Sequence, residues 1–108
     1  MALKRQQESG GKPDVRERLR EGAIVGDGAM GTYLYQLGVP VGVCAEELNL
    51  TRPELIRDVH RQYYNAGARL IETNTFAANR TKLDRYGLAN SVAEINRAGA
   101  AIAREAAG

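Results

Sequence analysis

The sequence predicts an α/β fold in which two parallel strands alternate with helices. Two short apolar runs, at residues 23–25 and 68–74, are the candidate strands, and neither alternates apolar with polar residues as a half-exposed strand does. A helix that begins at the capping box Thr51-Arg-Pro-Glu54 separates them. A strand, a helical crossover and a second strand form a right-handed βαβ unit. We therefore expect one βαβ unit followed by a further helix.

Local signals predict the other elements. Residues 1–14 are polar, contain two adjacent glycines and a proline, and are expected to form a disordered tail. The helix after Thr51 carries apolar residues at helical spacing and should stop at Gly67. A second capping box at Ser91 begins the last helix. Shorter helices are expected at residues 15–21 and 29–37, with a loop at 38–43.

Composition and charge exclude several classes of protein. The chain has 108 residues, 15 basic and 13 acidic, and its net charge is +2. The first 21 residues hold six basic and four acidic side chains, so residues 22–108 are balanced and give no electrostatic reason to expect nucleic-acid binding. No apolar run approaches the ~20 residues that a membrane span needs. With one cysteine and no signal-peptide pattern, the expected compartment is the cytoplasm.

The first motif with chemical potential is Gly26-Asp-Gly-Ala-Met-Gly-Thr32, at the end of the first predicted strand. Ligands of α/β folds bind beyond the carboxyl ends of the strands, where Asp27 could hold a cationic group such as an ammonium. The glycines would let a ligand approach the backbone. A capping aspartate in a glycine-rich turn is the structural alternative. The spacing also matches a dinucleotide fingerprint, but no acidic residue ends a strand roughly 20 residues later.

The second motif is Glu72-Thr-Asn-Thr-Phe76, at the end of the second predicted strand. Thr73 and Asn74 can donate hydrogen bonds to a carboxylate and accept them from an amine. Their structural alternative is capping of the strand end. The other polar candidates are assigned to structure or solvent: Glu46 and Glu47 to a solvated loop or helix start, His60 to a structural or surface position, and Cys44 to no catalytic role.

Four blocks in register give the chain a resemblance to the homocysteine S-methyltransferase family. The blocks are DGAMGT at 27–32, EELNLTRPE at 46–54, AGARLIETNTF at 66–76 and KLDRYGL at 82–88. The last block looks most like bacterial members in which this domain is fused to a methylenetetrahydrofolate reductase domain.

The resemblance implies a (β/α)₈ TIM barrel that transfers a methyl group to homocysteine to give methionine. Only the first two βα units would fit in this chain, so the barrel would be incomplete. The resemblance places Asp27, Gly28, Thr73, Asn74 and Phe76 in the homocysteine pocket, with Asp27 as partner of the amino group. It implies zinc, which favours the thiolate, but the family's cysteine ligands would lie beyond residue 108. No catalytic or metal-binding residue is therefore assigned here.

Two readings of the whole chain follow. In the first, residues 15–108 are the N-terminal part of a homocysteine-binding domain, because two parallel strands make no stable sheet alone. The chain is then expected to be inactive, because the zinc ligands that the resemblance implies lie outside it. The methyl donor stays open among folate, S-methylmethionine, betaine and a cobalamin partner. In the second, the chain is a short, non-catalytic interaction module that completes its sheet with a partner chain. Neither reading includes a nucleic-acid or membrane partner.

Overall fold

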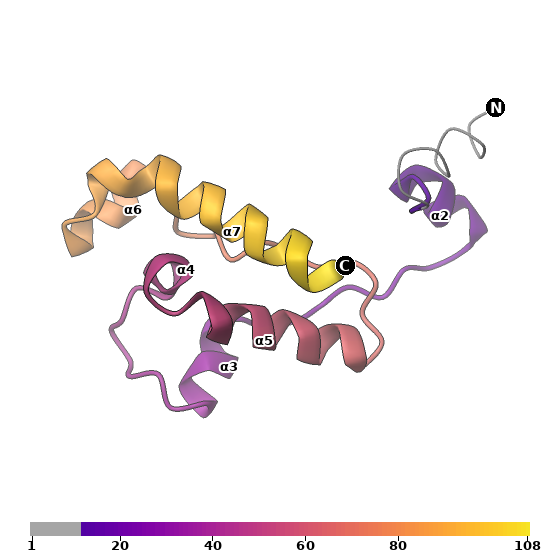
Figure 1. Cartoon of the computed structure of the whole chain (residues 1–108), viewed down its shortest axis with the longest axis horizontal. Helices are drawn as coiled ribbons and strands as arrows, with labels where there is room; N and C mark the ends of the chain where they lie inside the picture. The colour runs from indigo at the N-terminus through magenta and orange to yellow at the C-terminus, as the bar shows by residue number, and fades with distance from the viewer. Residues whose placement is uncertain (1–11) are drawn as a thin grey trace.

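The computed structural model describes residues 12–108, and within them the chain is a set of helices joined by extended segments and turns (Figure 1). The predicted tail at 1–14 falls almost wholly outside the described residues and stays a prediction. In chain order the elements are α2 (Val15–Glu21), α3 (Gly31–Gln36), the 3₁₀ turn η1 (Ala45–Glu47), α4 (Leu48–Thr51), α5 (Pro53–Asn65), α6 (Arg80–Leu83), the 3₁₀ turns η2 (Asp84–Tyr86) and η3 (Ala89–Ser91), and α7 (Val92–Ala107).

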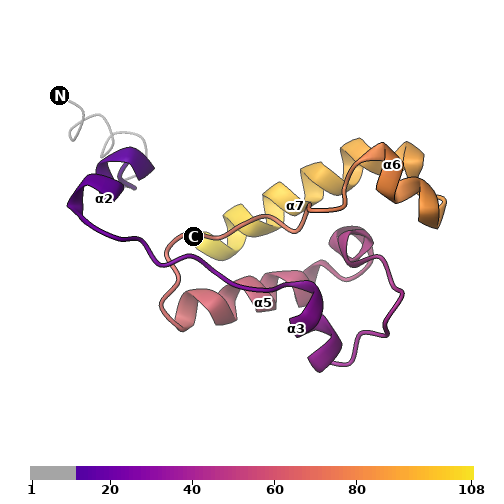
Figure 2. The same ribbon diagram turned by 180° about the vertical axis from the view of Figure 1, so that it is seen from behind.

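The predicted fold class is wrong: residues 12–108 contain no strand, and two βα units of a barrel are not formed. The two apolar runs are extended and meet at one parallel bridge, between Gly26 and Leu70. Around it, the Leu70 N–H donates to the Val25 carbonyl at 3.2 Å and the Asp27 N–H donates to the Leu70 carbonyl at 3.0 Å. Figure 2 shows the two segments running beside one another across α5 and α7.

The pairing stops after one bridge for a local reason. In a parallel ladder, the next hydrogen bond would join the N–H of Glu72 to the main-chain carbonyl of Asp27. Instead, that N–H donates to Oδ2 of the Asp27 side chain at 3.1 Å. A side chain has replaced the main chain as acceptor, so the ladder ends where the site begins.

The helices agree better with the sequence than the strands do. The predicted helices at 15–21 and 29–37 appear as α2 and α3, and the long helix ends at Asn65, near the predicted stop at Gly67. The predicted capping boxes are not formed, however, although Ser91 takes the N-cap position of α7 as predicted. Thr51 ends α4, and its hydroxyl donates to the Glu47 carbonyl at 3.4 Å. Ser91 precedes α7 but makes no side-chain cap hydrogen bond.

The core lies where α5 and α7 pack side by side (Figure 1). Their apolar faces meet α3 and α4 in one buried cluster. A second buried cluster joins the start of α7 to α6. The first contains Leu34, Val39, Leu48, Ile56, Val59 and Ile102, and the second contains Cys44, Ala78, Leu83 and Ile95.

Two asparagines join these helices to the segment before α6. Asn49 of α4 donates through Nδ2 to the carbonyl of Asn74 at 2.8 Å and to that of Ile95 at 3.2 Å. Asn74 returns a bond from its own Nδ2 to Oδ1 of Asn49 at 2.9 Å. Both side chains are buried, so these bonds satisfy polar groups that would otherwise cost stability. This asparagine clamp, formed by the side chains of Asn49 and Asn74, fixes residues 73–76 relative to α4 and α7.

No helix within residues 12–108 combines the length and the apolar character needed to cross a bilayer. The described chain measures 48 × 29 × 21 Å, and α2 stands apart from α3, α4 and α6 (Figure 1).

Candidate functional site

A cavity of about 350 Å³ opens where the two extended segments end. Three stretches line it: residues 27–31 after the first segment, 45–46 at η1, and 72–76 after the second. All five residues that the sequence predicts for the substrate pocket are among them: Asp27, Gly28, Thr73, Asn74 and Phe76. The fold therefore brings both motifs to one place although the predicted sheet is absent.

Asp27 joins the two motifs directly. Its Oδ2 accepts the N–H of Glu72 across 45 positions of sequence, which holds the carboxylate at the cavity wall. A carboxylate oriented by a backbone N–H is preorganised to receive a cation, because little rotamer freedom is left to lose on binding. The sequence prediction of an ammonium partner is compatible with this placement.

Gly28 is needed for packing as well as for access. A Cβ at this position would lie 3.1 Å from both Cε1 and the hydroxyl oxygen of Tyr63. Tyr63 is held in place because its hydroxyl donates to the Ala29 carbonyl at 2.6 Å and its ring packs edge-on against Tyr33. Burial, together with the negative charge of Asp27, raises the pKa of the Tyr63 phenol. Tyr63 therefore supports the turn beneath the site.

Asn74 combines a structural role with a place in the cavity wall. Its amide nitrogen is used by the clamp, because it donates to Oδ1 of Asn49 and to the Ala45 carbonyl, both at 2.9 Å. Its side chain is therefore fixed, and only its acceptor oxygen is left for a ligand. Asn74 therefore has a structural role in addition to its place in the cavity wall.

Thr73 and Phe76 are the more accessible members of the wall. The Thr73 hydroxyl shares a hydrogen bond with that of Thr75 at 2.7 Å, so one hydroxyl proton stays free for a further acceptor. Phe76 is 86% exposed, and the ammonium of Lys82 lies 4.5 Å from its ring centroid. An exposed aromatic side chain at the rim can cover a ligand that enters the cavity.

Glu46 is a charged lining residue that the sequence does not predict for the pocket. The predicted helix start agrees with its place in η1, but the predicted solvated position is wrong, because the side chain is only 8% exposed. One carboxylate oxygen accepts the Ala77 N–H at 3.1 Å, and the other accepts the thiol of Cys44 at 3.7 Å. Burial is the main cause that raises the pKa of the Cys44 thiol, which keeps it protonated. No local sequence signal marks this burial, because it depends on the contact with Ala77, 31 positions further along the chain.

His60 is fully buried in α5, which agrees with the structural assignment, but neither ring nitrogen has a hydrogen-bond partner among the described residues. Burial lowers the pKa of its imidazole, and the negative charge of Asp27 opposes that shift only in part. The ring is not one of the residues that line the cavity.

The residues present do not fit a zinc ion. Within residues 12–108, no group of three or more His, Cys, Asp or Glu side chains could hold a metal. Structural and catalytic zinc sites need three or four such ligands from the protein.

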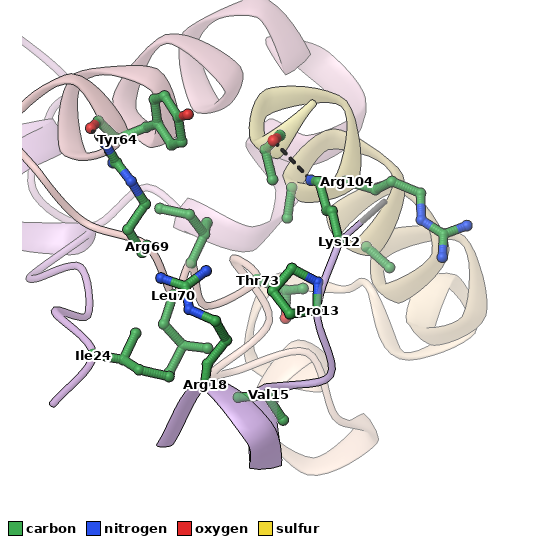
Figure 3. Close-up of a pocket in the computed structure, with 14 residues that line it drawn as sticks. Lys12, Pro13, Val15, Arg18, Ile24, Tyr64, Arg69, Leu70, Thr73 and Arg104 are labelled. Carbon is green, nitrogen blue, oxygen red and sulfur yellow. Dashed lines mark hydrogen bonds between the residues drawn. The ribbon is translucent and has the colours of Figure 1, made fainter. Parts of the chain in front are cut away.

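A larger cavity, of about 580 Å³, lies between α2, the second extended segment and the end of α7 (Figure 3). Its basic lining residues are Lys12, Arg18, Arg69 and Arg104, and its floor is apolar. Two of these cations already have partners: Lys12 donates to the Ala107 carbonyl at 2.9 Å, and Arg69 stacks on Tyr64. Only Thr73 of the predicted pocket residues touches this cavity. It has no carboxylate, so it does not suit an ammonium.

Comparisons with known proteins agree with the motifs. The family model for homocysteine S-methyltransferase matches residues 24–108, which include every predicted pocket residue. Methionine synthase from Mycobacterium leprae is 41% identical over 100 residues, and that of Mycobacterium tuberculosis is 40% identical over 100 residues; each alignment covers 87% of this chain. Betaine–homocysteine S-methyltransferase 1 from Danio rerio is 37% identical over 102 residues, or 91% of this chain.

Each alignment covers most of this chain but only a small part of the relative. The chain spans 8% of the length of the two methionine synthases and 26% of the length of the Danio rerio enzyme. The family match nevertheless covers most of the chain, and the matched blocks contain both motifs of the smaller cavity. The chain belongs to the homocysteine S-methyltransferase family.

Proposed function

We propose that this chain is the N-terminal part of a homocysteine-binding domain, over residues 15–108, and that the smaller cavity binds homocysteine. One observation carries the proposal: two motifs far apart in the sequence line a single cavity and are joined through the Asp27 carboxylate. Membership of the family supplies the identity of the substrate.

Each pocket residue has a defined part in binding. Asp27 receives the ammonium of homocysteine, because its carboxylate is fixed and has a second oxygen for a charge-assisted hydrogen bond. Thr73 and the acceptor oxygen of Asn74 orient the polar end of the amino acid. Gly28 leaves space for the substrate, and Phe76 covers it at the rim. These residues bind and orient; none of them attacks or transfers a proton.

The reaction of the whole protein is transfer of a methyl group to the sulfur of homocysteine, which gives methionine. The thiol loses its proton to solvent, the sulfur attacks the methyl carbon of the donor, and the donor leaves with the electron pair of the bond that breaks. Zinc would favour the thiolate, with ligands from beyond residue 108, because residues 12–108 do not supply a site for it. The names of the relatives include both methionine synthase and a betaine-dependent enzyme, so the donor is left open. We place the reaction in the cytoplasm.

Asp27→Asn tests the proposal. Asparagine can still accept the Glu72 N–H through its side-chain oxygen, so the segments stay joined while the charge is lost. We expect homocysteine affinity to fall about ten- to a hundredfold, since a charge-assisted hydrogen bond contributes roughly 1.5–3 kcal/mol and each ~1.4 kcal/mol is a factor of ten. The measurement is an NMR titration of the reduced amino acid into the chain.

Asp84→Asn is the matched control, because Asp84 is exposed and does not line the cavity. Equal affinity of the wild-type chain and Asp27→Asn would show that Asp27 does not hold the ammonium. Failure of the wild-type chain to bind homocysteine would contradict the proposed function itself.

A further inference from the structure

We infer that Glu46 is a specificity-determining residue that makes the cavity favour thiols carrying a cationic amino group over thiols without one. This role rests on the proposed function. Glu46 is not one of the five residues predicted for the homocysteine pocket.

The charge around the cavity is one-sided. Three carboxylates line it, those of Asp27, Glu46 and Glu72, and no lysine, arginine or histidine is among its described lining residues. Negative groups that face a partly enclosed space raise the local concentration of cations and repel anions. A thiol acid without an amino group would therefore bring only a negative charge, whereas an amino acid brings an ammonium.

Glu46 differs from the other two acids in its burial. Asp27 is half-buried and Glu72 is exposed, so water screens their charges. Glu46 is 8% exposed, and no ion pair to it is formed within residues 12–108. A buried charge without a counter-charge costs stability, and a cation that enters the cavity offsets part of that cost. An entering ammonium therefore gains more from Glu46 than from an equally distant exposed carboxylate.

Glu46 also has a structural contact that must be separated from its charge. Its carboxylate accepts the Ala77 N–H and so supports the segment that carries Thr73 and Asn74. Glutamine in its place can keep this hydrogen bond through its side-chain oxygen, because it has the same length. Glu46→Gln therefore removes the charge and leaves the support, whereas Glu46→Asp keeps the charge and shortens the side chain by one methylene.

The experiment compares two ligands on the full chain. Homocysteine and 4-mercaptobutanoate differ by the amino group alone, and NMR titration gives the affinity of each. We expect Glu46→Gln to lower the ratio of the two affinities about fivefold, because the negative charge that attracts the ammonium is removed. Glu47→Gln, which removes the neighbouring carboxylate outside the cavity, should leave the ratio unchanged.

The outcomes separate the inference from the proposed function. If the wild-type chain binds neither ligand, the proposed function fails. If it binds homocysteine and Glu46→Gln keeps the wild-type ratio, the inference is overturned while the proposed function stands. If Glu46→Gln does not fold, Glu46→Asp decides: an unchanged ratio supports the role of the charge, and a ratio as low as that expected for glutamine overturns it.

Discussion

At the scale of single residues, Asp27 shows how one side chain ends a secondary structure and begins a site. Its carboxylate takes the N–H that a main-chain carbonyl would take in a longer ladder. The same bond fixes the side chain at the cavity wall. The hydrogen bond that ends the pairing therefore also orients the carboxylate that we propose as the ammonium partner.

His60 gives a prediction about pH. It is the chain's single histidine, and burial holds the pKa of its imidazole below the ordinary value of 6.5. Below pH 6.5 the unfolded chain binds a proton at this residue that the folded chain resists, so the free energy of unfolding should fall as the pH drops below 6.5. Above that pH both states are neutral there, and His60 should add no pH dependence.

His60→Leu should remove this dependence between pH 7.5 and 5.5. The variant should also be at least as stable as the wild-type chain at pH 7, because two buried nitrogens without partners are replaced by carbon. Urea unfolding at several pH values measures both effects. A wild-type slope that persists in the variant would show that another group titrates in this range.

At the scale of elements, Gly99 sets how closely α7 approaches the asparagine clamp. A Cβ at this position would lie 2.8 Å from Cγ2 of Thr75 and 2.9 Å from Nδ2 of Asn49. Asn49 cannot easily move, because its amide is bonded to two carbonyls. We expect Gly99→Ala to lower the free energy of unfolding by about 1–3 kcal/mol, as overpacking of a core does.

The control for this substitution is Gly31→Ala in α3. A Cβ there would meet no atom within 4 Å, and alanine favours a helix by roughly 0.5–1 kcal/mol over glycine. Chemical denaturation of both variants should therefore give opposite signs. Equal stability of Gly99→Ala and the wild-type chain would mean that α7 is not held against the clamp at this distance.

The helices could be predicted because their signals are local. Apolar residues at helical spacing place Ile56 and Val59 on the buried face of α5, and the structure buries both. The absence of strands could not be predicted, because an extended segment becomes a strand only when neighbouring segments pair with it. Residues 23–25 and 68–74 have strand-like composition, but with one bridge between them neither becomes a strand. Composition alone does not report how many partners an extended segment will meet.

At the scale of the whole molecule, the described chain is more open than its length suggests. Its radius of gyration is 15.7 Å, whereas a compact domain of this length has about 13 Å. Two large apolar side chains that line the larger, basic cavity, Val15 and Leu70, are exposed. Such a surface is typical of an interaction or ligand surface.

Anilinonaphthalene sulfonate, an apolar anionic dye, should bind in this larger cavity. Arg18→Glu should reduce its fluorescence, because a cation at the lining becomes an anion. Arg20→Glu is the matched control on the same helix, since Arg20 is exposed and does not line the cavity. Equal losses in the two variants would indicate an effect of net charge and not of this cavity.

The lining of the smaller cavity was more predictable than the fold. The motifs single out Asp27 and Asn74, and the geometry that brings them together needs only the single bridge and the clamp. Glu46 escaped prediction because its burial depends on Ala77, which lies 31 positions further along the chain. A long-range contact of this kind leaves no local pattern in the sequence.

The homocysteine pocket is tested most directly by an NMR map of the amides that homocysteine perturbs. We expect shifts concentrated at residues 27–31 and 72–77, with the Glu72 amide among them because it is bonded to the Asp27 carboxylate. Shifts confined to α2 and the end of α7, around the larger cavity, or no shifts at saturating ligand, would contradict the proposed pocket.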